Sequence, residues 1–395
     1  MDTLNIAFVC YEAFLSGGIS IYTRELVSRL ASSGHSVALF SPPPRPGLET
    51  QISPAVRLES VPVPTLPLTS AAAFGARLPF TLHGAERKNG RFDIIHSNTY
   101  GTTFLPRFMT RGLRITTVHH LGTSSANSMK LGFLRRVRHP SAEYGPAIVL
   151  EGLSLRRADH LIAISEFTRN DILGKYTSIP APRVSVIYHG ATPRAVMAVA
   201  AETDRSKNLW GIENDKRVLL YVGRLEERKG ISFLLRAFSS IVRETRTKLL
   251  LVGPGEPRPY QIQARSLSID GDVIFAGRVD ERVLNAAYSL STALVHPAAI
   301  EGFGLAIADA VASGIPVVST RAGAIPEIVR DGIDGYLVNY GDTLAFADAI
   351  RNVLGSRTSL RNQLTRNEDS RFSWEKTCRE TLALYERLMN PDSSS

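Results

Sequence analysis

Short apolar segments that alternate with helical patterns run along the chain, and this alternation limits the possible folds more than any other feature. Residues 6–10 form a continuous apolar run, residues 20–32 form a helical pattern closed by Gly34, and residues 36–40 form a second apolar run. A strand, a helix and a strand at this spacing predict a parallel sheet with helices on its faces. The expected fold class is therefore α/β.

The same alternation occurs twice along the chain, which predicts two domains of one architecture. A proline-rich stretch at 41–67 is expected to be irregular. The further strands of the first series are expected at 94–96, 115–118, 160–163 and 184–188. Those of the second series are expected at 218–222, 248–252, 273–275, 293–296, 316–319 and 335–338.

This pattern predicts two Rossmann-like, doubly wound domains that face a cleft, with ligands at the carboxyl ends of the strands. A length of 395 residues agrees with two or three domains of about 150 residues each. We expect the first domain at residues 1–190 and the second at 191–370. A C-terminal helix within 371–392 is expected to pack back on the first domain.

Composition narrows the class of protein. The chain carries 46 Lys and Arg against 37 Asp and Glu, and its net charge of +9 favours polyanions such as phosphate ligands and acidic membranes. No zinc finger, basic zipper or RNP-like motif accompanies this charge, so nucleic acid is not expected as a partner. Two cysteines, Cys10 and Cys378, cannot build a disulfide framework or a zinc site. Because no apolar run approaches the roughly 20 residues that span a bilayer, and no basic leader occurs, we expect a soluble cytoplasmic protein.

The most informative segment is 296–318, which reads HPAAIEGFGLAIADAVASGIPVV and predicts a strand, a glycine-containing turn and a helix. Gly302 and Gly304 would let the backbone approach a ligand closely. The N–H groups that open the helix would stabilise an anion. Glu301 and Asp309 flank this helix start, and two such acceptors suit hydroxyl-rich groups on either side of a phosphate. The alternative is an ordinary helix with an acidic first turn and a glycine cap.

A second segment, 219–230, reads LLYVGRLEERKG and places Gly223 at the end of a predicted strand. Arg224 and Lys229 follow shortly after it. The planar fork of an arginine and the compact charge of a lysine together suit the oxygens of a diphosphate. The alternative is a strand followed by a solvated charged turn.

Together these segments resemble the retaining glycosyltransferases of family 4, the sucrose-synthase and mannosyltransferase-like group with the GT-B fold. Weaker matches lie at Gly17-Gly18, 158–172 and 185–191. The strongest motifs, in order, are GRLEERKG at 223–230, LVGPGE at 251–256, FAGRV at 275–279 and EGFGLAIADAVASGIPVVSTRAGAIPEIV at 301–329.

The resemblance implies a retaining transferase that moves a sugar from a UDP or GDP sugar to an acceptor hydroxyl. The first domain would supply most acceptor contacts and the second domain would bind the nucleotide. The acceptor, whether a glycan, a small molecule or a lipid-linked compound, stays open. Two alternatives are a nucleotide-sugar epimerase or hydrolase of related fold, and a non-catalytic module that binds anionic surfaces. No cofactor is expected.

The resemblance also assigns roles within the EGFG segment. It implies that Glu301 approaches the hydroxyls of the donor sugar, and that Asp309, where the family pattern has a glutamate, binds the ribose hydroxyls. The backbone N–H groups that would contact the sugar and the diphosphate are those of Phe303, Gly304 and Leu305.

Further donor-binding residues follow from the other matching motifs. Arg224 and Lys229 match the basic pair that contacts the diphosphate. Arg278 and Val279 match the segment that lines the base pocket. Gly18 matches a loop whose backbone approaches the phosphates from the first domain.

His119 matches a histidine that follows a strand and lies near the anomeric carbon of the donor sugar. Its neighbour His120 replaces a frequent aspartate, and the choice between the two stays open, as does an ordinary core role for either. His119 completes the expected catalytic set with Glu301, Arg224 and Lys229.

Asp270-Gly271-Asp272 fits the D-x-D pattern of metal-dependent transferases. However, it precedes a predicted strand, and Asp-Gly is ordinary turn chemistry. The cations Arg224 and Lys229 could stabilise the diphosphate instead. We therefore expect no metal.

The segment 130–138, KLGFLRRVR, combines four basic residues with apolar ones and contains no acid. Such a segment can lie on an anionic membrane surface, which would make the protein peripheral at the inner face of the membrane. The alternative is a solvated helix face that packs its apolar residues inward.

Overall fold

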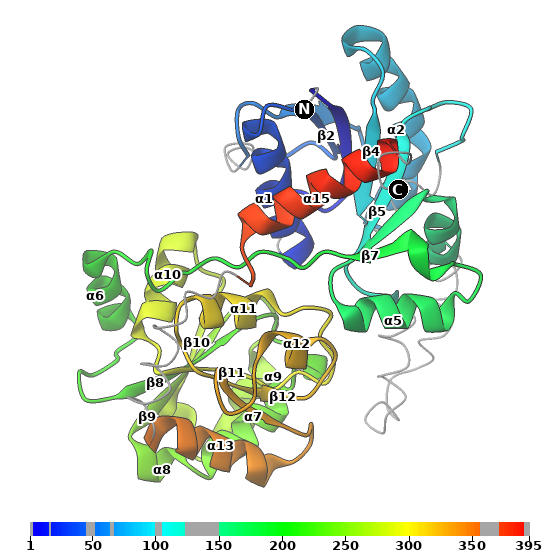
Figure 1. The fold of residues 1–395 in the computed structure, drawn as a ribbon. Coiled ribbons are helices and arrows are strands. Elements are labelled where there is room, and N and C mark those ends of the chain that lie inside the picture. Colours follow the sequence, from blue (N-terminus) through cyan, green and yellow to red (C-terminus); the bar gives the residue numbers. More distant parts are fainter. Residues whose placement is uncertain are drawn as a thin grey trace. The chain divides into compact units, whose positions relative to one another are not determined.

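The computed structural model describes residues 3–15, 17–44, 52–63, 67–98, 105–122, 150–355 and 371–390. The chain forms two compact units, one of Met1–Gly190 with Trp374–Ser395 and the other of Ala191–Ser373 (Figure 1). Each unit is built on one parallel sheet with helices packed against it, so the predicted α/β class is confirmed.

The sheet of the first unit has the strand order β3-β2-β1-β4-β5-β6-β7, and neighbouring strands are parallel. Its central strands are buried apolar runs, as is typical of parallel strands covered on both faces. The strands are β1 (Asn5–Val9), β2 (Ser36–Ser41), β3 (Arg57–Ser60), β4 (Ile94–Asn98), β5 (Leu113–Val118), β6 (His160–Ala163) and β7 (Val184–Val186). The helices named for this unit are α1 (Gly18–Ser32), α2 (Pro67–Asn89), α5 (Glu166–Lys175) and α15 (Trp374–Met389).

Strand β3 was not predicted, because it falls within the stretch 41–67 that was expected to be irregular. It pairs with β2, with Ala38 opposite Arg57 and Ser41 opposite Ser60. β3 is the edge strand of its sheet, and its residues alternate between half-buried and exposed positions. The continuous apolar run of a central strand is therefore absent, and the prediction for this part was wrong.

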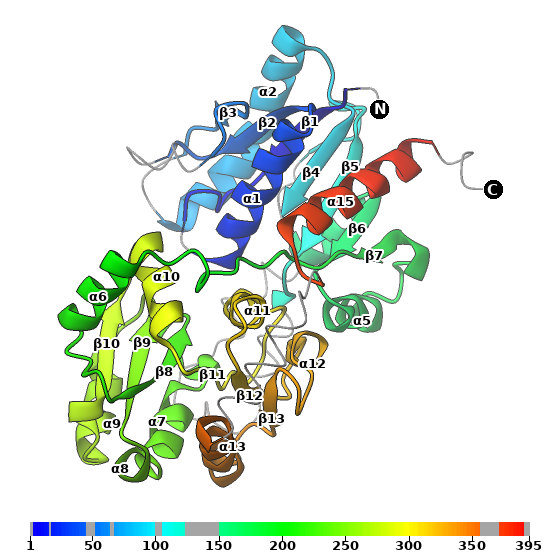
Figure 2. The same cartoon turned by 60° about the vertical axis from the view of Figure 1, so that its left-hand side comes forward.

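Helix α15 lies beside α1, as two views show (Figures 1 and 2). Successive side chains of a strand point to opposite faces of the sheet. On β4, Ile95 joins the apolar core beneath α2, and His96 bonds to the Tyr385 hydroxyl of α15. Thr377 Oγ1 of α15 also donates to the Tyr188 carbonyl over 2.8 Å. The C-terminal helix thus packs on the first unit.

The sheet of the second unit has the order β10-β9-β8-β11-β12-β13, again with parallel neighbours. Its strands are β8 (Arg217–Val222), β9 (Thr247–Val252), β10 (Val273–Gly277), β11 (Ala293–His296), β12 (Val317–Thr320) and β13 (Gly335–Val338). Its helices are α6 (Ala200–Leu209), α7 (Ile231–Ser239), α8 (Val242–Thr245), α9 (Arg258–Ser266), α10 (Glu281–Leu290), α11 (Leu305–Ala312), α12 (Ile325–Ile328) and α13 (Thr343–Gly355).

Helices α7, α9 and α13 share one apolar core with the strands of the second sheet, to which they contribute Phe233, Tyr260 and Phe346. Strands β8 and β11 are neighbours at the centre of this sheet. Packing of this kind holds their carboxyl ends in fixed relative positions, which is the requirement for a site built on the loops that follow them.

In each sheet the strand order reverses at one position, between β1 and β4 in the first unit and between β8 and β11 in the second. Loops that leave two adjacent strands in opposite directions form the usual ligand crevice of open parallel sheets. Arg224 and Lys229 follow β8, and Glu301 follows β11. The topology therefore brings these predicted site residues onto adjacent loops.

Candidate active site

Hydrogen bonds from the end of β12 and from the turn after it hold the loop that follows β11. Thr320 Oγ1 donates to the Ala298 carbonyl over 2.5 Å, and the Ala324 N–H donates to the Glu301 carbonyl over 2.9 Å. These bonds fix the backbone on either side of the turn. The Glu301 side chain therefore projects from a backbone segment whose position is fixed.

Gly230 brings the loop after β8 against the loop after β11. Its φ is +76°, and a Cβ at this position would lie 2.0 Å from the Pro297 carbonyl oxygen. Only a glycine accommodates both the left-handed backbone and the close approach. The neighbouring Lys229 is thereby placed so that its Nζ lies 2.6 Å from Glu301 Oε2.

Glu301 is an ionised carboxylate with one oxygen anchored. Its Oε2 accepts hydrogen bonds from Lys229 Nζ at 2.6 Å and from His296 Nε2 at 2.9 Å. Burial opposes ionisation, but the Lys229 charge and the His296 hydrogen bond outweigh it and hold the pKa of Glu301 well below its ordinary value. Oε1 accepts no hydrogen bond from any residue that the structure describes. The site therefore offers one free carboxylate oxygen, which suits a hydroxyl ligand.

The two predicted diphosphate cations differ in exposure. The Lys229 side chain is 12% exposed and is bonded to Glu301, whereas the Arg224 side chain is 53% exposed and lies 3.8 Å from Glu226. An ammonium group has three N–H donors, so Lys229 retains two after its bond to Glu301. Arg224 is placed by its backbone, since the Tyr221 hydroxyl donates to the Arg224 carbonyl over 2.8 Å.

The predicted backbone cradle lies at the start of α11. Gly304 precedes the helix with φ +101°, and no side chain caps it. The ring of Phe303 packs edge-on against Phe372, with ring centroids 5.6 Å apart. Phe303, Gly304 and Leu305 therefore form one uncapped helix start next to Glu301, a geometry that favours an anion.

Asp309 lies about one turn into α11, which begins at Leu305. Its carboxylate is buried and accepts hydrogen bonds from the Thr192 N–H at 2.8 Å and from Arg194 Nε at 2.6 Å. Burial disfavours the charged form of Arg194, but Asp309, Tyr288 and Glu281 together outweigh burial, so the pKa of the guanidinium is raised. Both carboxylate oxygens thus hold the segment that leads into the second unit, and the ribose contact predicted for Asp309 would compete with this ion pair.

Arg194→Ala should lower the free energy of unfolding by about 3 kcal/mol, because it removes the buried guanidinium that pairs with the buried carboxylate of Asp309. Urea denaturation followed by circular dichroism measures this effect. Arg351→Ala, which removes an arginine from ion pairs with the exposed Glu244 and Asp348, is the control and should cost at most about 1 kcal/mol. Equal losses in the two variants would contradict the role of the buried pair.

Arg278 and Val279, the predicted base-pocket residues, directly follow β10 at the edge of the second sheet. Arg278 is exposed and Val279 is half-buried. Because all strands of this sheet are parallel, this position lies on the same edge as the loops of Arg224 and Glu301. A ligand that extends along the carboxyl edge could reach all three.

The predicted residues of the first unit lie at the carboxyl ends of its own strands. Gly18 is the first residue of α1, which follows β1. His119 follows β5, is buried, and its Nε2 lies 3.0 Å from Asn98 Oδ1. Burial, followed by the nearby His189, lowers the pKa of His119 well below its ordinary value, so the ring is neutral. His120 is exposed.

Sequence analysis did not predict three residues of the second unit that support the site. His296 bonds to Glu301, Tyr221 fixes the backbone of Arg224, and Arg194 engages Asp309. The available signal for His296 was its place as a polar residue at the end of an apolar strand, directly before the Glu301 loop. Arg194 carried no comparable signal, since its partner is 115 residues away in the sequence.

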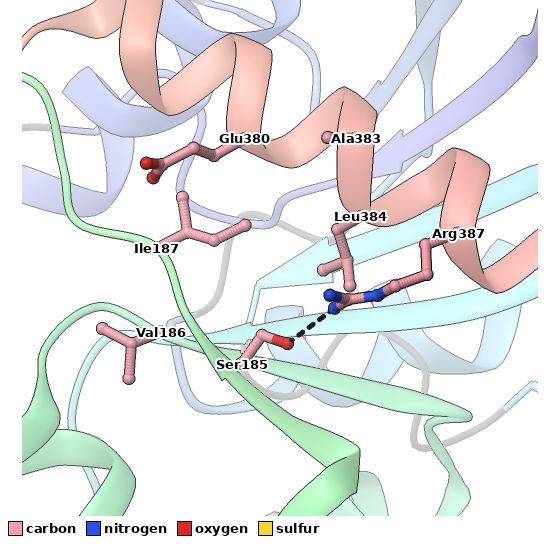
Figure 3. A pocket seen from close by; sticks show the side chains of 7 residues that line it. All are labelled: Ser185, Val186, Ile187, Glu380, Ala383, Leu384 and Arg387. Carbon is pink, nitrogen blue, oxygen red and sulfur yellow. Dashed lines mark hydrogen bonds between the residues drawn. The ribbon is translucent and has the colours of Figure 1, made fainter. Parts of the chain in front are cut away.

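A separate pocket of about 390 Å³ lies between β7 and α15 in the first unit (Figure 3). Arg387 donates to Ser185 Oγ there over 3.3 Å. None of the predicted site residues lines it, so it is distinct from the candidate site. Its lining residues are Ser185, Val186, Ile187, Glu380, Ala383, Leu384 and Arg387.

Two family profiles match the chain, one in each unit. Residues 17–190 match the glycosyl transferase 4-like domain, and residues 216–356 match the glycosyl transferases group 1. The D-inositol 3-phosphate glycosyltransferase of Corynebacterium urealyticum is 29% identical over 94% of this chain and 91% of its own length. A glycosyltransferase of Methanocaldococcus jannaschii is 25% identical over 98% of this chain and 99% of its own length.

Solved structures resemble the chain over nearly its full length. Sucrose-phosphate synthase from Thermosynechococcus elongatus has a TM-score of 0.82 at 23% identity, covering 98% of this chain and 100% of its own. HepE of Anabaena in complex with UDP and glucose has a TM-score of 0.76 at 18% identity, covering 97% and 99%. The fold is therefore GT-B, with two Rossmann-like domains. The chain belongs to the group 1 glycosyltransferases of family 4, and it is a transferase enzyme.

Proposed function

We propose that this protein is a retaining glycosyltransferase that moves a sugar from a nucleotide-sugar donor to an acceptor hydroxyl. The observation that carries the proposal is the clamped Glu301, whose Oε2 is held by Lys229 and His296 and whose Oε1 is open to a hydroxyl. The uncapped start of α11 follows directly and suits the donor diphosphate. A hydrogen-bond acceptor for the hydroxyls of the donor sugar and a site for its diphosphate thus lie within one loop.

A nucleoside diphosphate sugar is the proposed donor class. Support comes from Anabaena HepE, whose structure contains UDP and glucose, and from the arrangement of cations on the loop after β8. UDP and GDP sugars both fit this proposal. The acceptor is proposed only as a hydroxyl compound, which agrees with the corynebacterial relative, a glycosyltransferase of D-inositol 3-phosphate.

In the proposed reaction the acceptor hydroxyl attacks the anomeric carbon on the face from which the diphosphate leaves. The new carbon–oxygen bond forms as the bond to the phosphate oxygen breaks, and a diphosphate oxygen takes the hydroxyl proton. Arg224, the two remaining donors of Lys229 and the N–H groups at the start of α11 would stabilise the growing negative charge. The anomeric configuration is then retained, with no covalent nucleophile on the protein.

A panel of nucleotide sugars, scored for nucleotide release with and without candidate acceptors, tests the proposed function. Transfer that requires an acceptor supports it, and NMR of the anomeric proton in the product shows whether configuration is retained. Release without an acceptor would indicate a hydrolase, and sugar isomerisation would indicate an epimerase. Binding to acidic vesicles with no donor turnover would favour the non-catalytic module.

Chelation of divalent metals should leave turnover unchanged, because we propose that Arg224 and Lys229 take the part of a metal on the diphosphate. The D-x-D pattern does not point to the site: Asp272 Oδ1 is bonded to Lys248 Nζ at 2.9 Å, and the turn precedes β10 at the amino edge of the sheet. The measurement is initial rate with EDTA and after addition of Mg²⁺ or Mn²⁺. Loss with EDTA and recovery with metal would contradict metal independence.

Association with an anionic membrane surface at its cytoplasmic face stays a proposal. The segment 130–138, on which that prediction depends, lies outside the described residues. In the described part of the chain, none of the helices has both the length and the apolar character needed to cross a bilayer.

A further inference from the structure

His296 is a buried histidine that bonds to Glu301, the candidate catalytic carboxylate. It is the last residue of β11, its side chain is 3% exposed, and its Nε2 lies 2.9 Å from Glu301 Oε2. The ring of Tyr221, from the adjacent strand β8, is nearly parallel to that of His296, with centroids 5.7 Å apart and an interplanar angle of 12°. The orientation of the imidazole is therefore fixed by packing.

The bond to Glu301 defines which nitrogen of His296 carries the proton. Burial lowers the pKa of His296, more than Glu301 raises it, so the ring is neutral near pH 7 and has one N–H. A carboxylate anion can only accept, so Nε2 is the donor. Nδ1 then has an unshared electron pair, and it is buried without a hydrogen-bond partner among the described residues. The next residue, Pro297, has no N–H to offer it.

An unpartnered buried nitrogen costs stability, since a polar atom out of water is unfavourable unless it is hydrogen-bonded. A phenylalanine of similar shape would keep the stacking on Tyr221 without that cost. What the imidazole provides and an apolar ring does not is the N–H to Glu301. The advantage of a histidine over an apolar residue at this position therefore lies in its bond to the Glu301 carboxylate and not in core packing.

We propose that His296 is a positioning residue that, together with Lys229, fixes Glu301 so that Oε1 faces the donor sugar. The terminal torsion of a glutamate is broad when unrestrained. Two donors on the same oxygen, one from the loop after β8 and one from the end of β11, restrict that torsion and leave the second oxygen free. This inference rests on the proposed function, because it assigns the oriented oxygen to a donor hydroxyl.

Tyr221 links His296 to Arg224, the second cation predicted to bind the diphosphate. Its ring stacks on His296, and its hydroxyl donates to the Arg224 carbonyl over 2.8 Å. A change at His296 could therefore disturb Arg224 through the ring as well as Glu301 through the hydrogen bond. His296→Phe keeps an aromatic ring against Tyr221 and removes the N–H to Glu301, which separates the two effects.

The test compares His296→Phe and His296→Gln with the unmodified enzyme. Gln can place an amide N–H near the position of Nε2, so it is the rescue variant. We expect His296→Phe to lower kcat about tenfold to a hundredfold, as loss of one charge-assisted hydrogen bond implies, with a smaller change in donor KM. His296→Gln should recover most of this loss. His160→Phe, at a buried histidine on β6 whose Nε2 bonds to Ser185 Oγ, is the matched control and should keep kcat.

A pH measurement separates positioning from a merely structural role. Lys229 and His296 are the titratable groups that stabilise the Glu301 anion. Removal of the His296 donor destabilises the anion, so the pKa of Glu301 should rise and the acid limb of the kcat/KM profile should move to higher pH. Carboxyl carbon NMR of Glu301 should show the same direction, with a return toward the original pKa in His296→Gln. Thermal unfolding is measured alongside, because loss of the bond to Glu301 lowers the stability near pH 7 whereas removal of the unpartnered nitrogen raises it.

Unchanged kcat and an unchanged Glu301 titration in His296→Phe would overturn the inference. Activity that falls only in proportion to thermal stability, with no advantage of Gln over Phe, would also overturn it. Failure of the proposed function is distinguishable from both, because the unmodified protein would then show no transfer. The NMR titration would still report whether His296 holds Glu301.

Discussion

Lys229→Ala should lower turnover at saturating donor about a hundredfold, which corresponds to roughly 3 kcal/mol of transition-state stabilisation. Lys229 is expected to act in two ways: it holds Glu301 at 2.6 Å, and it has two further donors for the diphosphate. Because the negative charge on the diphosphate grows as the glycosidic bond breaks, the loss should exceed the loss in donor affinity. Steady-state kinetics and donor binding by calorimetry measure the two effects separately.

Two neighbouring arginines provide the comparison. Arg224→Ala should also reduce turnover, but less than Lys229→Ala, because Arg224 is more exposed and is not bonded to Glu301. Arg228→Ala is the control: Arg228 is exposed, pairs with Glu226 at 2.7 Å, and should keep near-normal kinetics. Lys229→Arg should recover activity only in part, since the charge is retained in another geometry. Near-normal turnover in Lys229→Ala would remove this lysine from the mechanism.

Gly304→Val should abolish donor binding, with donor affinity reduced beyond the range of calorimetry. The residue has φ +101°, a region that a β-branched residue avoids, and an added Cβ would lie 3.2 Å from Glu301 Cγ and 3.1 Å from Ile307 Cδ1. The variant would therefore displace the carboxylate and cover the N–H groups at the start of α11. Thermal-shift assays with UDP and GDP, and calorimetry with the donor that is turned over, measure the result.

Gly341→Val supplies a control with nearly the same backbone strain. Gly341 has φ +95°, and nothing lies within 4 Å of an added Cβ. Both variants should lose a similar amount of thermal stability from the left-handed conformation, but only Gly304→Val should lose donor binding. Equal donor binding in the two variants would remove the proposed phosphate cradle from α11.

Much of the architecture could be predicted because its signals are local. Central strands of a parallel sheet are buried on both faces and read as continuous apolar runs, so strands such as β8 and β11 were found at nearly their observed positions. The edge strand β3 was missed because its residues alternate between half-buried and exposed positions. Helix α15 was found from its own pattern, and it was expected to pack back on the first domain, whereas its contact with α1 came only from the structure.

The candidate site likewise has features with a local sequence signal and features without one. A glycine pair before a helix, an acid at its start and two cations after a strand could be read directly, and they indicated Glu301, Arg224 and Lys229. The direct bond between Lys229 and Glu301 joins residues 72 positions apart. It depends on β8 and β11 being neighbours in the sheet, although β9 and β10 lie between them in the sequence.

The sequence alone therefore determined the α/β class and the two sheets, because burial and helix periodicity are properties of short segments, and it predicted the principal site residues from local motifs. Only the tertiary structure decided which charges meet. It directed Arg194 to Asp309, placed His296 and Lys229 on the same oxygen of Glu301, and left the other oxygen open. The physical reason is that hydrogen bonds and ion pairs act over a few ångströms in space, and the strand order that sets those distances is not a property of any one segment.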